Sequence, residues 1–204
     1  MRKIFVTGIG TDVGKTVVSS ILVEAHQADY WKPIQTGAYY STDSEKLKEL
    51  ISNEVTVIHP EAYIFQQPMS PHAAAEQLGT SVSLSNINLP ETTNDTLIIE
   101  GAGGIMVPLN ENEFMIDLMQ KLEAETILVV QNYLGSINHS LLSIEALQRR
   151  KVNILGLIFN GAPHQLSEDI ILKYSGLKSL GKIAKELELN KKIISRYAGN
   201  FKEI

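Results

Sequence analysis

Residues 7–16 read Thr-Gly-Ile-Gly-Thr-Asp-Val-Gly-Lys-Thr, and this glycine-rich stretch decides the fold. An apolar run at residues 3–7 leads into it, and a segment of helical character at about residues 15–27 follows it. At such a strand-to-helix junction, glycines let backbone amides converge on phosphate oxygens, the helix N-terminus adds positive potential, and the lysine adds a mobile charge. The stretch therefore predicts a loop that binds the phosphates of a nucleotide.

Two features of this loop depart from the usual pattern. The strict spacing puts the first glycine at Ile9, whereas the chain has Gly8 and Gly10 on either side of that position. An aspartate, Asp12, also stands inside the loop, where its negative charge repels phosphate. We therefore expect the Asp12 side chain to face outward or to hold a cation, such as a substrate amine.

Three continuous apolar runs rich in β-branched residues lie at residues 96–99, 126–130 and 154–159. Such runs are typical of strands that are covered on both faces. Each leads into a polar or glycine-rich turn, and helical stretches lie between them, notably residues 138–150. Strands that alternate with helices pair in parallel through right-handed crossovers. We predict an α/β fold with three layers, α/β/α, around a mostly parallel, doubly wound sheet of the P-loop NTPase type, with ligands beyond the carboxyl ends of its strands.

Shorter elements complete this prediction. Residues 30–34 are expected to form a second strand, and residues 43–50 a helix with Ser41 or Thr42 as its N-cap. Pro71 is expected to open another helix through residues 73–75, because the first helical turn needs no proline N–H. No internal repeat or linker interrupts the chain, so we expect residues 1–204 to form a single catalytic nucleotide-binding domain.

Composition narrows the class of function. The 204 residues are 44% hydrophobic, and 18 basic against 23 acidic residues give a net charge of −5. An acidic surface makes nucleic acid a poor candidate partner. The absence of cysteine excludes disulfides, iron–sulfur clusters and thiolate zinc sites. No signal peptide and no apolar run of membrane-spanning length is recognisable, so we expect a cytoplasmic protein without a membrane partner.

Polar residues near the predicted strands are candidates for the chemistry. Glu100 closes a buried run beside the phosphate loop, where an acidic residue commonly orients Mg²⁺, and the Thr16 hydroxyl can ligate the same ion. Lys32 is expected inside a short strand, where it either extends to the surface or points into a site, and the sequence leaves both open. Asp43 by itself is an ordinary acidic residue in the first turn of a helix.

Six motifs occur in one order along most of the chain and together resemble the dethiobiotin synthetase family. They are Val-Thr-Gly-x-x-Thr-x-x-Gly-Lys-Thr (6–16), Trp-Lys-Pro-Ile-Gln-Thr-Gly (31–37), Ser-Thr-Asp (41–43), Pro-Met-Ser-Pro-His (68–72), Ile-Glu-Gly-Ala-Gly-Gly (99–104) and Leu-Gly-Ser-Ile-Asn-His (134–139). The second, fifth and sixth are far more specific than the phosphate loop.

The resemblance implies an ATP-dependent cyclo-ligase of biotin biosynthesis. Carbon dioxide or bicarbonate and one amine of 7,8-diaminononanoate give a carbamate, which ATP phosphorylates. The neighbouring amine then closes the cyclic urea dethiobiotin, so that ADP and phosphate are released.

The same resemblance assigns roles to residues. It implies that Lys32, Lys15 and Thr11 are catalytic, and that Thr16, Asp43 and Glu100 hold Mg²⁺. It places the nucleotide on Asp12, Val13, Gly14, Lys15, Thr16, Val17, Asp43, Glu100, Gly101, Ala102, Gly103, Asn160 and Gly161. The diamino fatty acid-like substrate would meet Thr36, and its tail carboxylate would meet Gly135, Ser136, Ile137 and Asn138 across a homodimer interface. One departure concerns base recognition, because Ala184 stands where many relatives have proline.

Two other classes of protein share parts of this pattern. Partitioning and metal-delivery ATPases carry an early loop lysine that acts across a dimer, but the corresponding position here is Gly10. A nucleotide-dependent binding module would use ATP to control a partner protein. Turnover of ATP that depends on the diamine and bicarbonate would distinguish the synthetase from both.

Overall fold

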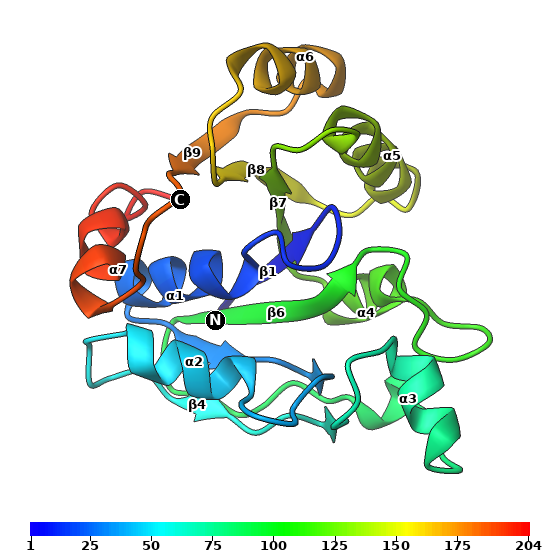
Figure 1. The fold of residues 1–204 in the computed structure, drawn as a ribbon. Helices are drawn as coiled ribbons and strands as arrows, with labels where there is room; N and C mark the ends of the chain where they lie inside the picture. Colours follow the sequence, from blue (N-terminus) through cyan, green and yellow to red (C-terminus); the bar gives the residue numbers. More distant parts are fainter.

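A seven-stranded parallel sheet forms the centre of the computed structural model, which describes residues 1–204 (Figure 1). Its strands, in the order β4-β2-β6-β1-β7-β8-β9, are Ile58–His59, Asp29–Trp31, Thr96–Gly104, Arg2–Gly8, Glu125–Gln131, Ile154–Asn160 and Ser179–Ile183. A separate two-stranded sheet pairs β3 (Ile34–Gln35) with β5 (Tyr63–Ile64). The predicted α/β class with a parallel, doubly wound sheet is confirmed.

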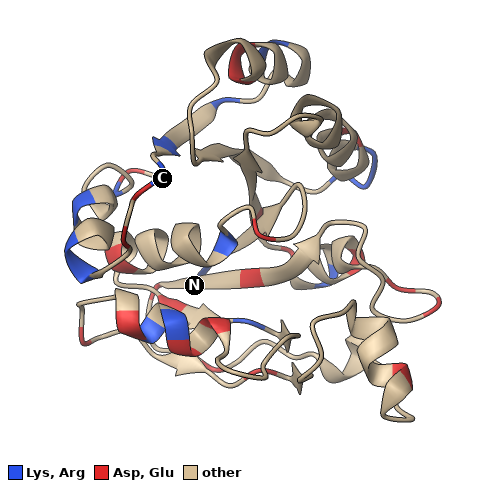
Figure 2. Ribbon diagram, in the orientation of Figure 1, with Lys and Arg blue, Asp and Glu red and all other residues tan.

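Seven helices flank the sheet, together with a short 3-10 turn at Leu84–Asn86. They are α1 (Lys15–His26), α2 (Asp43–Leu50), α3 (Pro71–Gln77), α4 (Met115–Leu122), α5 (Ser136–Arg149), α6 (Gln165–Ser175) and α7 (Lys191–Ala198). Charged segments lie mainly on the helices and loops, whereas the strands carry few (Figure 2). None of the helices combines the length and the apolar character needed to cross a membrane.

Alternating side chains of the central strands build a core on each face of the sheet. Ile4 and Val6 of β1 belong to a cluster with residues of α1, α2 and α7, whereas Phe5 belongs to a cluster with residues of α3 and α4. This division follows from the two-residue period of a strand. Because both faces are covered, chemistry is left to the edge of the sheet where the strands end.

Two predicted strand boundaries are wrong. The strand expected at residues 30–34 ends at Trp31, because Pro33 lacks the N–H that a central strand needs. Lys32 therefore lies in the link between β2 and β3, not within a strand. Glu100 does not end its strand either, since β6 continues through the glycines to Gly104, which pairs with Gly8 of β1.

The predicted helix starts are accurate to within two residues. α2 covers residues 43–50, as predicted, and Thr42 is its N-cap in a capping box with Glu45. Pro71 occupies the first turn of α3. Helix α5 begins at Ser136 rather than at residue 138, directly after Gly135.

A buried acidic residue, Asp29, links three segments at the start of β2. Its carboxylate accepts hydrogen bonds from the Val57 N–H (2.8 Å), the Asn94 side-chain amide (2.6 Å) and the Thr92 hydroxyl. His59 Nε2 lies 3.2 Å from Asp29 Oδ2. Burial alone would raise the pKa of Asp29, but these hydrogen bonds outweigh burial and hold the pKa below its ordinary value.

We predict that Asp29→Asn lowers the free energy of unfolding at pH 7 by about 3 kcal/mol, because an amide leaves buried donors unpaired. The depressed pKa means that the ionised Asp29 stabilises the fold above about pH 4 and loses this effect as the pH falls through the folded-state value. Urea unfolding at pH 7 and below pH 4 should show the difference shrinking in acid. The exposed Asp95→Asn is the control, and an equal loss in both variants would contradict the prediction.

Candidate active site

The phosphate loop joins β1 to α1 in the predicted place. Gly14 is the N-cap of α1 with a φ of 93°, and a Cβ there would lie 2.0 Å from Asn160 Nδ2, so only glycine fits. Asn160, at the end of β8, donates a hydrogen bond from Nδ2 to the Val13 carbonyl (2.9 Å). Lys15 folds back over the loop and donates to the Gly10 carbonyl (2.9 Å). The loop is thereby held with its lysine over the backbone that would meet a phosphate.

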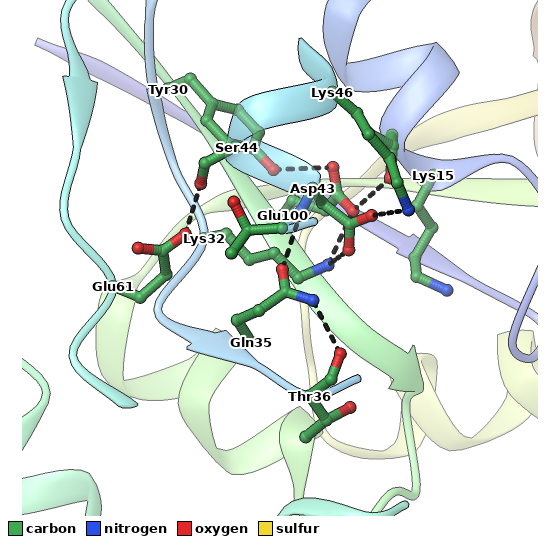
Figure 3. A network of polar contacts seen from close by, with 12 residues as sticks. Lys15, Tyr30, Lys32, Gln35, Thr36, Asp43, Ser44, Lys46, Glu61 and Glu100 are labelled. Carbon is green, nitrogen blue, oxygen red and sulfur yellow. Dashed lines mark hydrogen bonds and ion pairs between the residues drawn. The ribbon is translucent and has the colours of Figure 1, made fainter. Parts of the chain in front are cut away.

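Four side chains from distant parts of the chain meet beside this loop (Figure 3). The Lys32 ammonium lies between two carboxylates, 2.5 Å from Asp43 Oδ2 and 2.9 Å from Glu100 Oε1. The Thr16 hydroxyl donates to the same Glu100 oxygen at 2.9 Å. Lys32 is 4% exposed and Glu100 is 1% exposed. The sequence left open whether Lys32 points outward, and the structure points it into the site.

The backbone around Asp43 is fixed by a residue that the sequence did not single out. Gln35 accepts a hydrogen bond from the Asp43 N–H (3.0 Å) and donates to the Thr36 carbonyl (2.7 Å) (Figure 3). Gln35 thus connects the start of α2 to the turn after β3. Gln35 lies in the motif Trp-Lys-Pro-Ile-Gln-Thr-Gly, which was the only feature of the sequence that could have indicated its role. A glutamine in a strand does not by itself indicate a function.

The charges of the site shift the proton affinities of its groups. Burial alone would lower the pKa of Lys32, but Glu100 and Asp43 outweigh burial and raise the pKa above its ordinary value. Burial would likewise raise the pKa of Asp43, yet Lys32 holds that pKa below its ordinary value. Lys15 has fewer compensating contacts, and burial lowers its pKa to about 8. Burial and the nearby Glu100 charge raise the pKa of Tyr30 well above its ordinary value, so its phenol stays neutral.

A cavity of about 790 Å³ opens over these groups. Twelve of the residues singled out from the sequence line it: Thr11, Asp12, Gly14, Lys15, Thr16, Val17, Lys32, Thr36, Asp43, Glu100, Ala102 and Gly103. Asp12 is exposed at its rim, with a φ of 58°. Further lining comes from Gln35, Gly37, Lys46, Val107 and residues 68–71. The last segment belongs to a motif of the resemblance, but nothing in its residue types indicated contact with a ligand.

Eight of the singled-out residues do not line this cavity. Val13 belongs to the phosphate loop and accepts a hydrogen bond from Asn160, and Gly161 follows β8. A Cβ on Gly101 would lie 2.8 Å from the Phe5 ring, so this glycine is required by packing. Residues 135–138, from Gly135 to Asn138, lie at the start of α5, away from the cavity.

Ala184, which stands where many relatives have proline, uses its backbone N–H in a hydrogen bond. Its N–H, which a proline would lack, donates to the Tyr197 hydroxyl (3.0 Å). That hydroxyl donates in turn to Glu186 (2.6 Å), which also pairs with Arg196 (2.5 Å). Helix α7 therefore fixes the segment after β9 through a hydrogen bond in place of a proline ring.

The donors at the centre suit a hard cation. The carboxylates of Asp43 and Glu100 both contact Lys32, and the Thr16 hydroxyl donates to Glu100. No group of three or more His, Cys, Asp and Glu side chains that could hold a metal ion occurs. Magnesium is typically held by one or two carboxylates together with ligand phosphates, whereas softer metals need nitrogen or sulfur. Thr16, Asp43 and Glu100 therefore fit Mg²⁺ with a bound nucleotide.

We predict that nucleotide affinity falls as the pH rises above about 8, because Lys15 then loses the charge that attracts phosphate. The fall should approach tenfold per pH unit if one proton is involved. Calorimetry of AMP-PNP binding from pH 7 to 9.5 measures this effect. Lys15→Arg is the matched control, since arginine keeps its charge in this range and should give a flat profile. An equally steep fall in this variant would assign the titration to another group.

Comparison with known proteins identifies the family. A family described as "AAA domain" matches residues 2–192. The chain is 48% identical to the "ATP-dependent dethiobiotin synthetase BioD" of Cytophaga hutchinsonii, over 97% of this chain and 96% of the relative. It is 50% identical to the protein of that name from Christiangramia forsetii, over 99% and 97%.

Solved structures show the fold alone. A ParA family ATPase from Chlorobium tepidum aligns with a TM-score of 0.60 at 11% identity, covering 97% of both chains. The Pyrococcus furiosus cell division ATPase MinD aligns with a TM-score of 0.59 at 14% identity, covering 100% of this chain and 99% of the other. Such low sequence identity to these structures says nothing about function. The dethiobiotin synthetases, in contrast, match this chain over almost its whole length. The chain therefore belongs to the family of ATP-dependent dethiobiotin synthetases.

Proposed function

We propose that this protein synthesises dethiobiotin from 7,8-diaminononanoate, CO₂ and ATP. The observation that carries the proposal is the placement of Lys32 between Asp43 and Glu100, next to the phosphate loop. The relatives named dethiobiotin synthetases support the reaction. Residues 1–204 act together as one catalytic domain in this proposal, and the use of ATP favours a cytoplasmic location.

The charge balance of the site supports a requirement for Mg²⁺. Lys15 and Lys32 carry two positive charges, and Glu100 and Asp43 carry two negative ones. A triphosphate would therefore bring negative charge that these side chains do not neutralise. Thr16, Asp43 and Glu100 are proposed to hold Mg²⁺, which when bound offsets charge on the phosphate oxygens.

The proposed order of bond changes gives each of the chain's own residues a role. Lys15 is proposed to hold the phosphates and Lys32 the carbamate, so that two anions approach each other despite their repulsion. A carbamate oxygen then bonds to the γ-phosphorus as the bond to ADP breaks. The second amine attacks the carbamate carbon, and phosphate and a proton leave. Because both amines are on one molecule, held near Thr36, closure gains an effective molarity of about 10⁵ M or more.

Thr11 and the residues assigned to the nucleotide complete this proposed site. Thr11, with Lys15 and Lys32, is assigned to catalysis through the family motif. The nucleotide is assigned to Asp12–Val17, Asp43, residues 100–103, Asn160 and Gly161. Asn160 and Gly161 lie behind the loop, at the end of β8 next to the end of β9, where a base could extend from the phosphates.

An apolar surface beside the site supports a homodimer. Leu134 is fully exposed, and Tyr133, Ile137, Leu142 and Met106 are also exposed. This surface, defined by these five residues, adjoins a second cavity of about 320 Å³ that includes Leu142 and Met106. Thr11 and Val107 line both cavities, so a second copy on this surface would reach the catalytic cleft. The start of α5 at residues 135–138 would then offer helix N-terminal amides to the tail carboxylate of the partner's substrate.

The rival functions are not supported by a specific observation. Structural likeness to the ParA family ATPase extends to the fold alone. Gly10 stands at the position where partitioning ATPases are expected to carry a lysine. They would hydrolyse ATP without a diamine, so substrate dependence separates the two functions.

We predict that phosphate release requires the diamine and bicarbonate together with Mg²⁺ and ATP. Lys32→Ala should lower kcat by at least about 10²-fold, the typical effect of losing a preorganised charge. Lys48→Ala, an exposed lysine on α2 outside the cavity, is the control and should leave kcat unchanged. Release of phosphate without the diamine would overturn the proposed reaction, and a normal rate in Lys32→Ala would overturn the role of that residue.

We also predict that Leu134→Asp converts a dimer into a monomer, because the interface would bury an unpaired charge. Sedimentation should detect the change, and KM for the diamine should rise in the monomer. Leu187→Asp alters another fully exposed leucine, in the segment after β9, and should leave the dimer intact. A wild-type protein that is an active monomer would contradict this geometry.

A further inference from the structure

A tyrosine in the core touches the central carboxylate from the side opposite the cavity. Tyr30 is the middle residue of β2 and is fully buried, in register with Ile98 of β6 and Ile58 of β4. Its ring belongs to the apolar cluster on the face of the sheet that α1 and α2 cover. The hydroxyl donates a hydrogen bond to Glu100 Oε2 at 3.0 Å (Figure 3). Tyr30 does not line the cavity.

The two oxygens of Glu100 are thereby given different tasks. Oε2 is turned into the core, where Tyr30 satisfies it, and Oε1 is turned toward Thr16 and Lys32. The terminal torsion of a glutamate has a broad, twofold energy profile, so the chain itself does not fix this orientation. A directional partner on Oε2 does fix it. The phenol is also a neutral donor, and it leaves the carboxylate charge available to a cation.

We propose that Tyr30 is a positioning residue, which orients the Glu100 carboxylate so that Oε1 faces the cation and the nucleotide. This inference rests on the proposed role of Glu100 in holding Mg²⁺. Removing an outer hydrogen-bond partner of a metal ligand typically weakens metal binding by about 10- to 100-fold. The hydroxyl of Tyr30 should therefore affect metal affinity far more than affinity for the diamine, because it contacts Glu100 and does not line the cavity.

The test measures metal binding directly. Binding of Mn²⁺ in the presence of AMP-PNP is followed by electron paramagnetic resonance in the wild type, Tyr30→Phe, Glu100→Gln and Tyr63→Phe. Tyr63 supplies the control, because its hydroxyl bonds to Ser83 and Asn86, outside the cavity. We expect at least about tenfold weaker Mn²⁺ binding in Tyr30→Phe and unchanged binding in Tyr63→Phe.

Kinetics separate positioning from a general loss of structure. In Tyr30→Phe the Mg²⁺ concentration for half-maximal activity should rise by a similar factor, whereas KM for the diamine stays unchanged and saturating Mg²⁺ restores kcat. Urea unfolding verifies that the variant is folded, and Tyr30→Leu serves as a second variant without a hydroxyl.

The outcomes are distinguishable. Weakened Mn²⁺ binding in Glu100→Gln with normal binding in both Tyr30 variants overturns the role of Tyr30 alone. Normal binding in Glu100→Gln overturns the assignment of Glu100 as a metal ligand, on which the inference depends. A loss of kcat in Tyr30→Phe that Mg²⁺ does not restore would also overturn the positioning role.

Discussion

The burial of opposite charges at one edge of the sheet is the constraint on which the site depends. Glu100 is almost completely removed from water, and such a charge is stable only with partners. Lys32 forms an ion pair with one oxygen of Glu100, and Tyr30 donates a hydrogen bond to the other. Lys32 forms a second ion pair with Asp43. Because every group is held by another, the site is preorganised before a ligand arrives. Preorganised charge is the largest contribution that most enzymes make to transition-state stabilisation.

The fold supplies this edge through the order of its strands. From β1 the chain moves to β2 and β4 on one side, and from β6 it crosses to β7, β8 and β9 on the other. The ends of β1 and β6 therefore meet where the direction changes, which is where doubly wound sheets bind ligands. Glu100 pairs with Val6 of β1, and after a shift in register β6 pairs again at Gly104, so Glu100 is held within a strand beside the phosphate loop. A carboxylate on a flexible turn could not be oriented as firmly.

The fold of this protein is shared by proteins with very different sequences. ParA and MinD structures share this fold at 11–16% identity, yet the residues that would carry chemistry here lie in local motifs. Likeness at this identity shows the fold alone, whereas the sequence relatives show the family. The sheet is a scaffold, and the function resides in the few side chains placed at its edge.

The amino-acid sequence by itself determined the features that depend on neighbouring residues. The phosphate loop, the Thr42 cap, the proline start of α3 and the buried parallel strands all follow from local spacing and residue type. Helices α4, α6 and α7 and strand β9 were not identified. β9, for example, contains a glycine and a lysine and has no continuous apolar run. Its strand state comes from pairing with β8, which a local pattern does not contain.

Only the tertiary structure decided which polar side chains meet. Thr16 and Glu100 are 84 residues apart, and Lys32 and Glu100 are 68 apart, so no spacing rule predicts their contact. The family resemblance named these residues, but the direction of Lys32 and the parts played by Gln35 and Tyr30 emerged from the fold. The physical reason is that a carboxylate can be buried at low cost only where the folded chain brings donors to both of its oxygens.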